Sequence, residues 1–151
     1  MKTSFWLTVL ALAGTTMSGI AQSPPSGATF IDSNKVATAF ARGAPLLENG
    51  EYKIHASRRD SPGIAEIHTR DTDIIHVLEG SAIFVTGGTV AEPKTIVSDE
   101  IRGKEIKGGQ SRRIGKGAVI VVPNGVPHWF QQIDAPLLYY VVKVTSTSAE
   151  K

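Results

Sequence analysis

The residues of this chain with the widest chemical range are its four histidines, His55, His68, His76 and His128. The 151 residues contain no cysteine, which excludes disulfides, thiolate metal sites and a cysteine nucleophile. Any metal site must therefore use imidazole and carboxylate groups, which suit divalent first-row metals. Serine hydrolysis also lacks support, because no nucleophile elbow of the form G-x-S-x-G occurs.

Two of the histidines lie near carboxylates in segments that alternate like strands. Glu66 and His68 are two residues apart, so on a strand they point to the same face. Asp73 opens the next predicted strand, and His128 lies in a strand near the end of the chain. Three strands of one barrel can bring these four side chains into one pocket. Such a set would hold a divalent ion (Fe, Mn, Ni or Zn) with open positions, and its oxygen ligands favour iron or manganese.

A metal-free polar pocket is the alternative interpretation of the same residues. Asp73 has a short side chain, and metal coordination tolerates distance errors of only about 0.2 Å. If a metal binds, we expect His68 and His128 to be its principal ligands, followed by Asp73 and then by Glu66.

The remaining histidines and the paired arginines have simpler interpretations. His76 points away from the predicted site, which favours a sheet interface or dimer contact over metal ligation. His55 lies on the polar face of its strand, where we expect it to be solvated. The pairs Arg58-Arg59 and Arg112-Arg113 could neutralise an acidic substrate, but exposed arginines of this kind are usually solvated.

The elements that must position these side chains are short strands separated by turns. One helix is predicted to begin at Asp32 or Ser33 and to stop at Gly43. A tight turn is expected at Glu79-Gly80, and a long loop over 87–111. Alternation of apolar residues predicts strands over 51–58, 64–69, 73–78, 81–86, 118–122, 127–133 and 136–145. This pattern predicts an all-β antiparallel sandwich or barrel with one short N-terminal helix.

The alternation also assigns side chains to faces. In 51–58, Ile54 and Ala56 share one face while His55 and Ser57 share the other. In 127–133, the residues predicted to share the face of the site are His128, Phe130 and Gln132.

Two segments of the sequence resemble the signature motifs of the cupin superfamily. The later one has Gly117, then Pro123-Asn124-Gly125, then His128, and it ends at Gln132, where the family has Asn. The earlier one ends in the family's Val-Leu-Glu-Gly at residues 77–80. It departs from the family at the ligands, since Glu66-x-His68 followed by Asp73 replaces His-x-His followed by Glu.

The resemblance covers roughly residues 50–145 and implies a single cupin-type antiparallel β-barrel, or jelly roll. It also implies that the chain can form a homodimer. The resemblance specifies the function less closely than the fold, because the superfamily includes dioxygenases, isomerases, decarboxylases, ligand-binding regulators and storage proteins.

The N-terminal residues have the three-part pattern of a secretory signal. Lys2 precedes an apolar run over 5–13, and Gly19-Ile20-Ala21 offers small residues for cleavage. Spanning a bilayer needs roughly 20 apolar residues, so stable membrane insertion is not expected. We therefore predict a signal peptide at 1–21, a flexible linker at 22–30 and a cupin β-barrel domain at 31–148. The protein is then secreted or periplasmic.

Charge and composition restrict the classes of molecule that the protein is expected to bind. Lys and Arg number 16 and Asp and Glu 14, a formal net charge of +2, which is too small an excess for a nucleic-acid surface. A small-molecule ligand or substrate is the expected partner. The sequence favours metal-dependent chemistry on a small organic molecule, of dioxygenase or isomerase type. The alternative is a non-catalytic cupin that binds a small ligand.

Overall fold

The structure is a computed structural model that describes residues 27–146 of the chain. The predicted signal peptide at 1–21 lies outside the described residues. So do residues 22–26 of the predicted linker and residues 147–148 of the predicted domain. Residues 27–30 contain neither helix nor strand, and the first regular element begins at Ser33.

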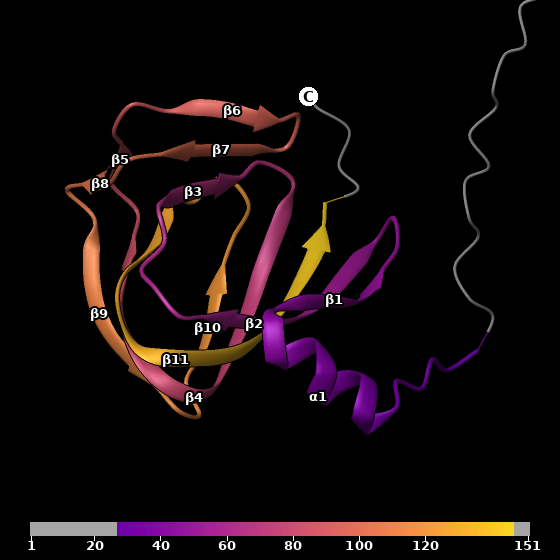
Figure 1. Ribbon diagram of the computed structural model, residues 1–151. Helices are drawn as coiled ribbons and strands as arrows, with labels where there is room; N and C mark the ends of the chain where they lie inside the picture. Colours follow the sequence, from indigo (N-terminus) through magenta and orange to yellow (C-terminus); the bar gives the residue numbers. More distant parts are fainter. Residues whose placement is uncertain (1–26, 147–151) are drawn as a thin grey trace, which may run out of the picture.

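The described residues form one helix and eleven strands (Figure 1). The helix α1 spans Ser33–Arg42. The first strands are β1 (Ala44–Glu48), β2 (Tyr52–Arg59), β3 (Ala65–His68), β4 (Asp71–Thr86), β5 (Thr89–Val90) and β6 (Lys94–Val97). They are followed by β7 (Glu100–Gly103), β8 (Ile106–Lys107), β9 (Gln110–Gly115), β10 (Val119–Val122) and β11 (His128–Thr145).

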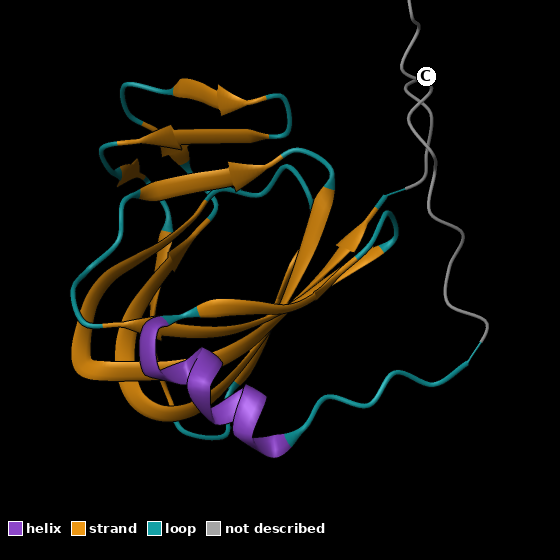
Figure 2. Cartoon of the chain, turned by 45° about the vertical axis from the view of Figure 1, so that its right-hand side comes forward, coloured by secondary structure: helices purple, strands orange, loops and turns teal. Residues whose placement is uncertain are grey.

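Nine of these strands form one antiparallel sheet that curls into a barrel, with α1 on its outside (Figure 2). The long strand β11 connects the sheet, because it pairs with β2, β3 and β4. The short strands β5 and β8 pair separately. This architecture confirms the predicted all-β antiparallel barrel with one N-terminal helix.

The main core fills one part of the barrel interior. Its largest members come from the inward faces of β4 and β11, where residues at every second position are buried. Ile75, Val77 and Leu137 are each exposed by 1% or less, so this part of the interior is closely packed. The polar side chains therefore gather in the other part of the interior, toward β3 and β7.

The helix begins and ends where the sequence predicted. The amide N of Asn34 donates to Asp32 Oδ1 at 2.7 Å, so Asp32 caps the first turn. Gly43 follows the last turn with φ of +69°. One face of α1 packs on the outside of β1 and β2, where Ala39 and Ala56 are buried.

On β2 an apolar side chain packs on the outer side of the barrel and polar side chains face the interior, which is the reverse of the usual arrangement. Ala56 is buried beneath α1 on the outer side of the barrel, whereas His55 and Ser57 line an interior pocket. The expectation that His55 is simply solvated is wrong: its ring lies in the pocket wall, and Nε2 contacts Glu48 Oε1 at 2.7 Å.

The predicted turn at Glu79-Gly80 is also absent, because β4 runs unbroken from Asp71 to Thr86. Gly80 has φ of +79° and lies against the backbone of 134–137, where β11 shows its own irregular register. Both strands bend at this corner of the barrel instead of reversing. The strands predicted at 73–78 and 81–86 therefore form the single strand β4, and most of the two strands predicted at 127–133 and 136–145 forms the single strand β11.

The stretch 87–111, expected to be a loop, contains four short strands and the start of β9. The strands β6 and β7 form a hairpin that pairs with β3 through β7 (Figure 1). All four residues of β6 are exposed, so no buried face imposes an alternating pattern on its sequence. Edge strands of this kind give a weak periodic signal.

The outer face of the barrel keeps several apolar side chains in solvent. Val119 and Val121 on β10 are 63% and 59% exposed, beside His76 and Ile74 on β4. His76 is itself exposed on this face, away from the pocket, as its strand position predicted. Formation of a homodimer stays a prediction. Within residues 27–146, the helix is too short to cross a membrane.

The corner at Gly80 allows a direct test of the bent strand. An alanine Cβ there would lie 2.4 Å from the carbonyl oxygen of Pro136, whereas at Gly117 (φ +85°) it would meet nothing within 4 Å. Gly80→Ala should lower the unfolding free energy by about 3 kcal/mol or more. Gly117→Ala, which shares only the backbone cost, should lower it by about 1 kcal/mol. Urea denaturation of both variants measures the difference, and equal costs would contradict the close packing of the corner.

Candidate metal centre

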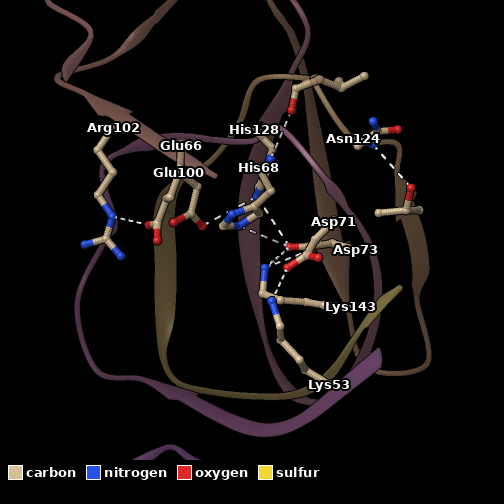
Figure 3. Close-up of polar contacts among 12 residues, drawn as sticks. Lys53, Glu66, His68, Asp71, Asp73, Glu100, Arg102, Asn124, His128 and Lys143 are labelled. Carbon is tan, nitrogen blue, oxygen red and sulfur yellow. Dashed lines mark hydrogen bonds and ion pairs between the residues drawn. The ribbon is translucent and has the colours of Figure 1, made fainter. Parts of the chain in front are cut away.

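Strand register assembles the predicted site. His128, the first residue of β11, lies directly opposite Glu66 of β3. On the same face of β3, two residues further on, is His68, which pairs with Glu100 of β7. Asp73 lies on β4 and is paired with Lys143 of β11. All four predicted site residues thus point into one region of the barrel interior (Figure 3).

Three of these residues form a compact set of ligand atoms. One atom each from Glu66, His68 and His128 lies within 4.8 Å of the other two. The Nε2 atom of His128 is 3.5 Å from Glu66 Oε1, and the two imidazole rings have centroids 5.2 Å apart. Two imidazoles and one carboxylate converging on one point are a donor set for a divalent first-row metal.

His128 is oriented as a metal ligand would be. Its side chain is buried, and Nδ1 lies 3.2 Å from the carbonyl oxygen of Val126. Since a carbonyl only accepts, this contact is a hydrogen bond when Nδ1 carries the proton, and in that neutral tautomer Nε2 would present its lone pair to a metal ion. The Nε2 atom is buried without a hydrogen-bond partner. A buried polar atom without a partner is costly, and a metal ion would satisfy it.

The turn that precedes β11 directs His128 into the barrel interior. Gly125 has φ of +80°, and its amide N donates to the carbonyl oxygen of His68 at 2.8 Å. The side-chain amide of Asn124 donates to the carbonyl oxygen of Thr69 at 3.2 Å (Figure 3). The turn before one histidine is thus hydrogen-bonded to the end of the strand that carries the other.

Glu66 is ionised in this environment. Burial raises its pKa, but the hydrogen bond and positive charge that a protonated His128 would supply, together with the charge of Arg59, outweigh burial and lower the pKa to about 2. The Nη2 atom of Arg59 lies 3.6 Å from Glu66 Oε1, beyond normal hydrogen-bonding distance. The carboxylate therefore keeps acceptor capacity for another partner.

His68 is held in its neutral form. Burial lowers its pKa, and the positive charge of Lys143 lowers it further, while Asp73 and Glu66 act in the opposite direction. A neutral imidazole is the form that binds metal ions. One of its ring nitrogens lies within 4.8 Å of the ligand atoms of Glu66 and His128.

Asp73 has a partner of its own. Lys143 Nζ donates to both of its carboxylate oxygens, at 2.8 and 2.9 Å. Its Oδ2 is nevertheless only 3.5 Å from His68 Nε2 and 3.7 Å from His128 Nε2. Asp73 is therefore adjacent to the three clustered ligand atoms but outside their compact set. Its role as a metal ligand, which the sequence analysis ranked above that of Glu66, stays a prediction.

The pocket that contains this site, the metal-site pocket, has a volume of about 270 Å³. Sequence reasoning did not place in it the charged residues Arg59, Glu100, Arg102 and Lys143. The sequence does single out Lys143, because it is the only charged residue in the apolar run 136–145. Arg59 had been interpreted as solvated, but its guanidinium lies over the ring of Phe130, 4.6 Å from the centroid. Arg58, Arg112 and Arg113 lie outside this pocket.

Gln132 does not share the face of His128 and Phe130, contrary to the prediction. The register of β11 against β4 shifts between Phe130 and Gln132, so one extra residue is inserted in β11. Such a bulge reverses the faces that follow it. Gln132 is consequently exposed, and Ile133 packs against the core in its place.

Comparison with known proteins agrees with the fold. The profile of the cupin family matches residues 31–151, which is most of the chain. A comparison with curated protein sequences found no match.

Several solved structures share the architecture at low sequence identity. The BH2720 protein of Bacillus halodurans aligns with a TM-score of 0.56 and 13% identity, over 83% of this chain and 87% of that one. The NMB1881 protein of Neisseria meningitidis gives 0.51 and 12%, over 78% and 100% of the chains. A cupin protein of Bacteroides fragilis gives 0.50 and 10%, over 73% and 81%. These similarities concern the fold alone.

The ion pair between Lys143 and Asp73 predicts a large stability effect. Lys143→Met would leave a buried carboxylate without its cation, so the unfolding free energy should fall by about 3–5 kcal/mol. Lys53→Met removes a more exposed partner from Asp71, which keeps its hydrogen bond from Thr145, and should cost about 1 kcal/mol or less.

Chemical denaturation of both variants measures the two costs. The double variant Lys143→Met with Asp73→Asn should recover part of the loss, because it no longer buries an unpaired charge. Equal costs for the two lysine variants would contradict the assignment of Lys143 as the principal partner of Asp73.

Proposed function

The chain belongs to the cupin family, and we propose that it is a metal-dependent enzyme acting on a small organic molecule. The observation that carries the proposal is the convergence of Glu66, His68 and the unpartnered Nε2 atom of His128 at one point of the barrel interior. These three side chains would hold the ion. Iron, manganese, nickel and zinc all accept such ligands, and the single carboxylate favours iron or manganese.

The chemistry of such a site depends on positions left open for substrate. A bound divalent ion supplies Lewis-acid or redox chemistry to a substrate oxygen. Three protein ligands leave further positions available, which is typical of catalytic sites and not of closed structural ones. Because Lys143 holds both oxygens of Asp73, a fourth protein ligand is disfavoured. This argument favours catalysis, of dioxygenase or isomerase type, over a binding protein with a filled metal shell.

The residues around the ligands have separate tasks in this proposal. Burial raises the pKa of Tyr139, against the opposing influence of Arg59, so its hydroxyl keeps its proton. That hydroxyl accepts from Arg59 Nε at 3.0 Å and also interacts with the side chain of Ser57, so it is held at the border of the pocket. Phe130, Ile75 and Val141 form apolar parts of the pocket wall and limit the access of water.

Metal analysis of the purified protein tests the proposal. We expect about one equivalent of a divalent metal after reconstitution, lost in His68→Ala, His128→Ala and Glu66→Gln. His76→Ala is the matched control, because this histidine is exposed on the outer face of β4 and should leave the metal content unchanged.

Asp73→Asn separates the two candidate carboxylates. If Glu66 is the ligand, Asp73→Asn should retain most of the metal, although it disturbs the neighbouring ion pair. Loss of metal in Asp73→Asn with retention in Glu66→Gln would reverse that assignment. Substoichiometric metal that is insensitive to all four site substitutions would overturn the metal-centred proposal.

We also propose that the protein is exported. The basis is the sequence pattern of residues 1–21, which predicts a cleaved signal peptide. Protein recovered from the periplasm or the medium of an expressing cell should begin near Gln22, as N-terminal sequencing or intact mass would measure. A protein that keeps Met1 and remains in the cytoplasm would contradict this.

A further inference from the structure

A second pocket lies beside the metal-site pocket, at the junction of α1, β1 and β2. It has a volume of about 330 Å³, and we call it the arginine pocket because its wall includes Arg42, Arg58 and Arg59. Arg42 is the last residue of α1, and β1 begins two residues later (Figure 2). The arginine pocket also shares four lining residues with the metal-site pocket: His55, Ser57, Arg59 and Tyr139.

The arginine pocket is lined by cationic and neutral groups, and no carboxylate is among its lining residues. Arg58 forms an ion pair with Asp60, and His55 contacts Glu48, but neither acid faces the pocket. Arg42 has no ion-pair partner within the described part of the chain. The metal-site pocket differs, since Glu66, Asp73 and Glu100 line it.

The C-terminal end of α1 opposes this positive charge only in part. A helix end carries the equivalent of about half a negative charge, whereas each guanidinium carries a full positive one. Arg42 more than offsets the helix end, whereas Arg58 is paired with Asp60. The positive charge left to act on a ligand therefore comes from Arg42 and from Arg59, whose Nη2 is 3.6 Å from Glu66 Oε1. The pocket therefore attracts anions.

Arg59 borders both pockets and is fixed in place. Its Nε donates to the hydroxyl of Tyr139 at 3.0 Å, and its guanidinium stacks over Phe130. The Nη2 atom is 3.6 Å from Glu66 Oε1, so its hydrogens make no close hydrogen bond there. Its terminal nitrogens lie on the side of Gly63 and Glu66, so Arg59 contributes a fixed positive charge at the border of the two pockets.

We infer that the molecule bound by this protein carries an anionic group, a carboxylate or a phosphate, which binds in the arginine pocket against Arg59. The inference deepens the proposed function: the anionic end is held by Arg59, Arg58 and Arg42, while a polar end extends past Tyr139 toward Glu66, His68 and His128. The substrate class is thus a small organic acid or phosphate ester.

Anion binding to metal-free protein tests the inference without requiring the metal site. An NMR titration of isotope-labelled protein with succinate, and separately with inorganic phosphate, should give saturable shifts at the backbone amides of residues 42–45 and 55–59. Sodium chloride at matched ionic strength serves as the reference. Saturation by succinate alone indicates a carboxylate ligand, saturation by phosphate alone indicates a phosphate ligand, and either supports the inference.

Variants locate the binding site. Arg59→Gln should weaken binding by about tenfold or more, because charge-assisted hydrogen bonds to the anion are lost. Arg59→Lys keeps the charge but not the planar fork, and should give an intermediate loss. Arg58→Gln and Arg42→Gln should each weaken binding several-fold with little effect on the fold. Arg112→Gln removes an equivalent charge from exposed β9, outside both pockets, and should have no effect.

His128→Ala separates this inference from the metal proposal. It should abolish metal binding while leaving anion affinity in the metal-free protein unchanged, because His128 does not line the arginine pocket. The inference is overturned if neither anion saturates at tens of millimolar, or if binding is insensitive to Arg59→Gln, Arg58→Gln and Arg42→Gln alike. Those results would leave the metal measurements unaffected.

Discussion

The hydrogen-bonded register of β11 is the constraint on which the rest of this structure depends. This one strand pairs with β3 at its first residue, with β4 along its length and with β2 over its second half. It therefore places His128 against Glu66 at one end and Lys143 against Asp73 near the other. Because side chains alternate along a strand, a slip of one residue would remove all of these contacts together.

Electrostatics within the barrel follow from this register. Buried charges persist only where they are paired, and cross-strand neighbours supply the pairs: Lys143 with Asp73, and Lys53 and Thr145 with Asp71. Glu66 is different, since its nearest cation is more than hydrogen-bonding distance away. The same interior thus contains one carboxylate that is ion-paired with a lysine and one whose nearest cation is beyond hydrogen-bonding distance. Asp73 and Glu66 carry the same charge, but their strand neighbours give them different capacities to bind a further ligand.

Much of this arrangement could be predicted from alternation and turn residues. The face shared by Glu66 and His68, the outward direction of His76 and the turn at Gly125 are all local properties of the sequence. The errors arose where tertiary packing overrides a local signal. Gly80 was predicted to lie in a turn, but together with 134–137 of β11 it bends two long strands. The bulge before Gln132 has no signal in its own residues. The orientation of Arg59 depends on Phe130 and Tyr139, which are remote in sequence.

The outward packing of Ala56 beneath α1 has a consequence for how this protein can change over evolutionary time. The side chains that pack β2 against α1 and β1 lie on one face, with Leu46 and Ala39, and three of the four that border the two pockets, His55, Ser57 and Arg59, lie on the other; Arg58 is the exception. Neighbouring residues of β2 therefore have different roles: some stabilise the fold and others border the pockets. Substitutions at His55 or Ser57 can retune the ligand while the helix keeps the strand in place. A lineage carrying this barrel could acquire new ligands without first rebuilding its core.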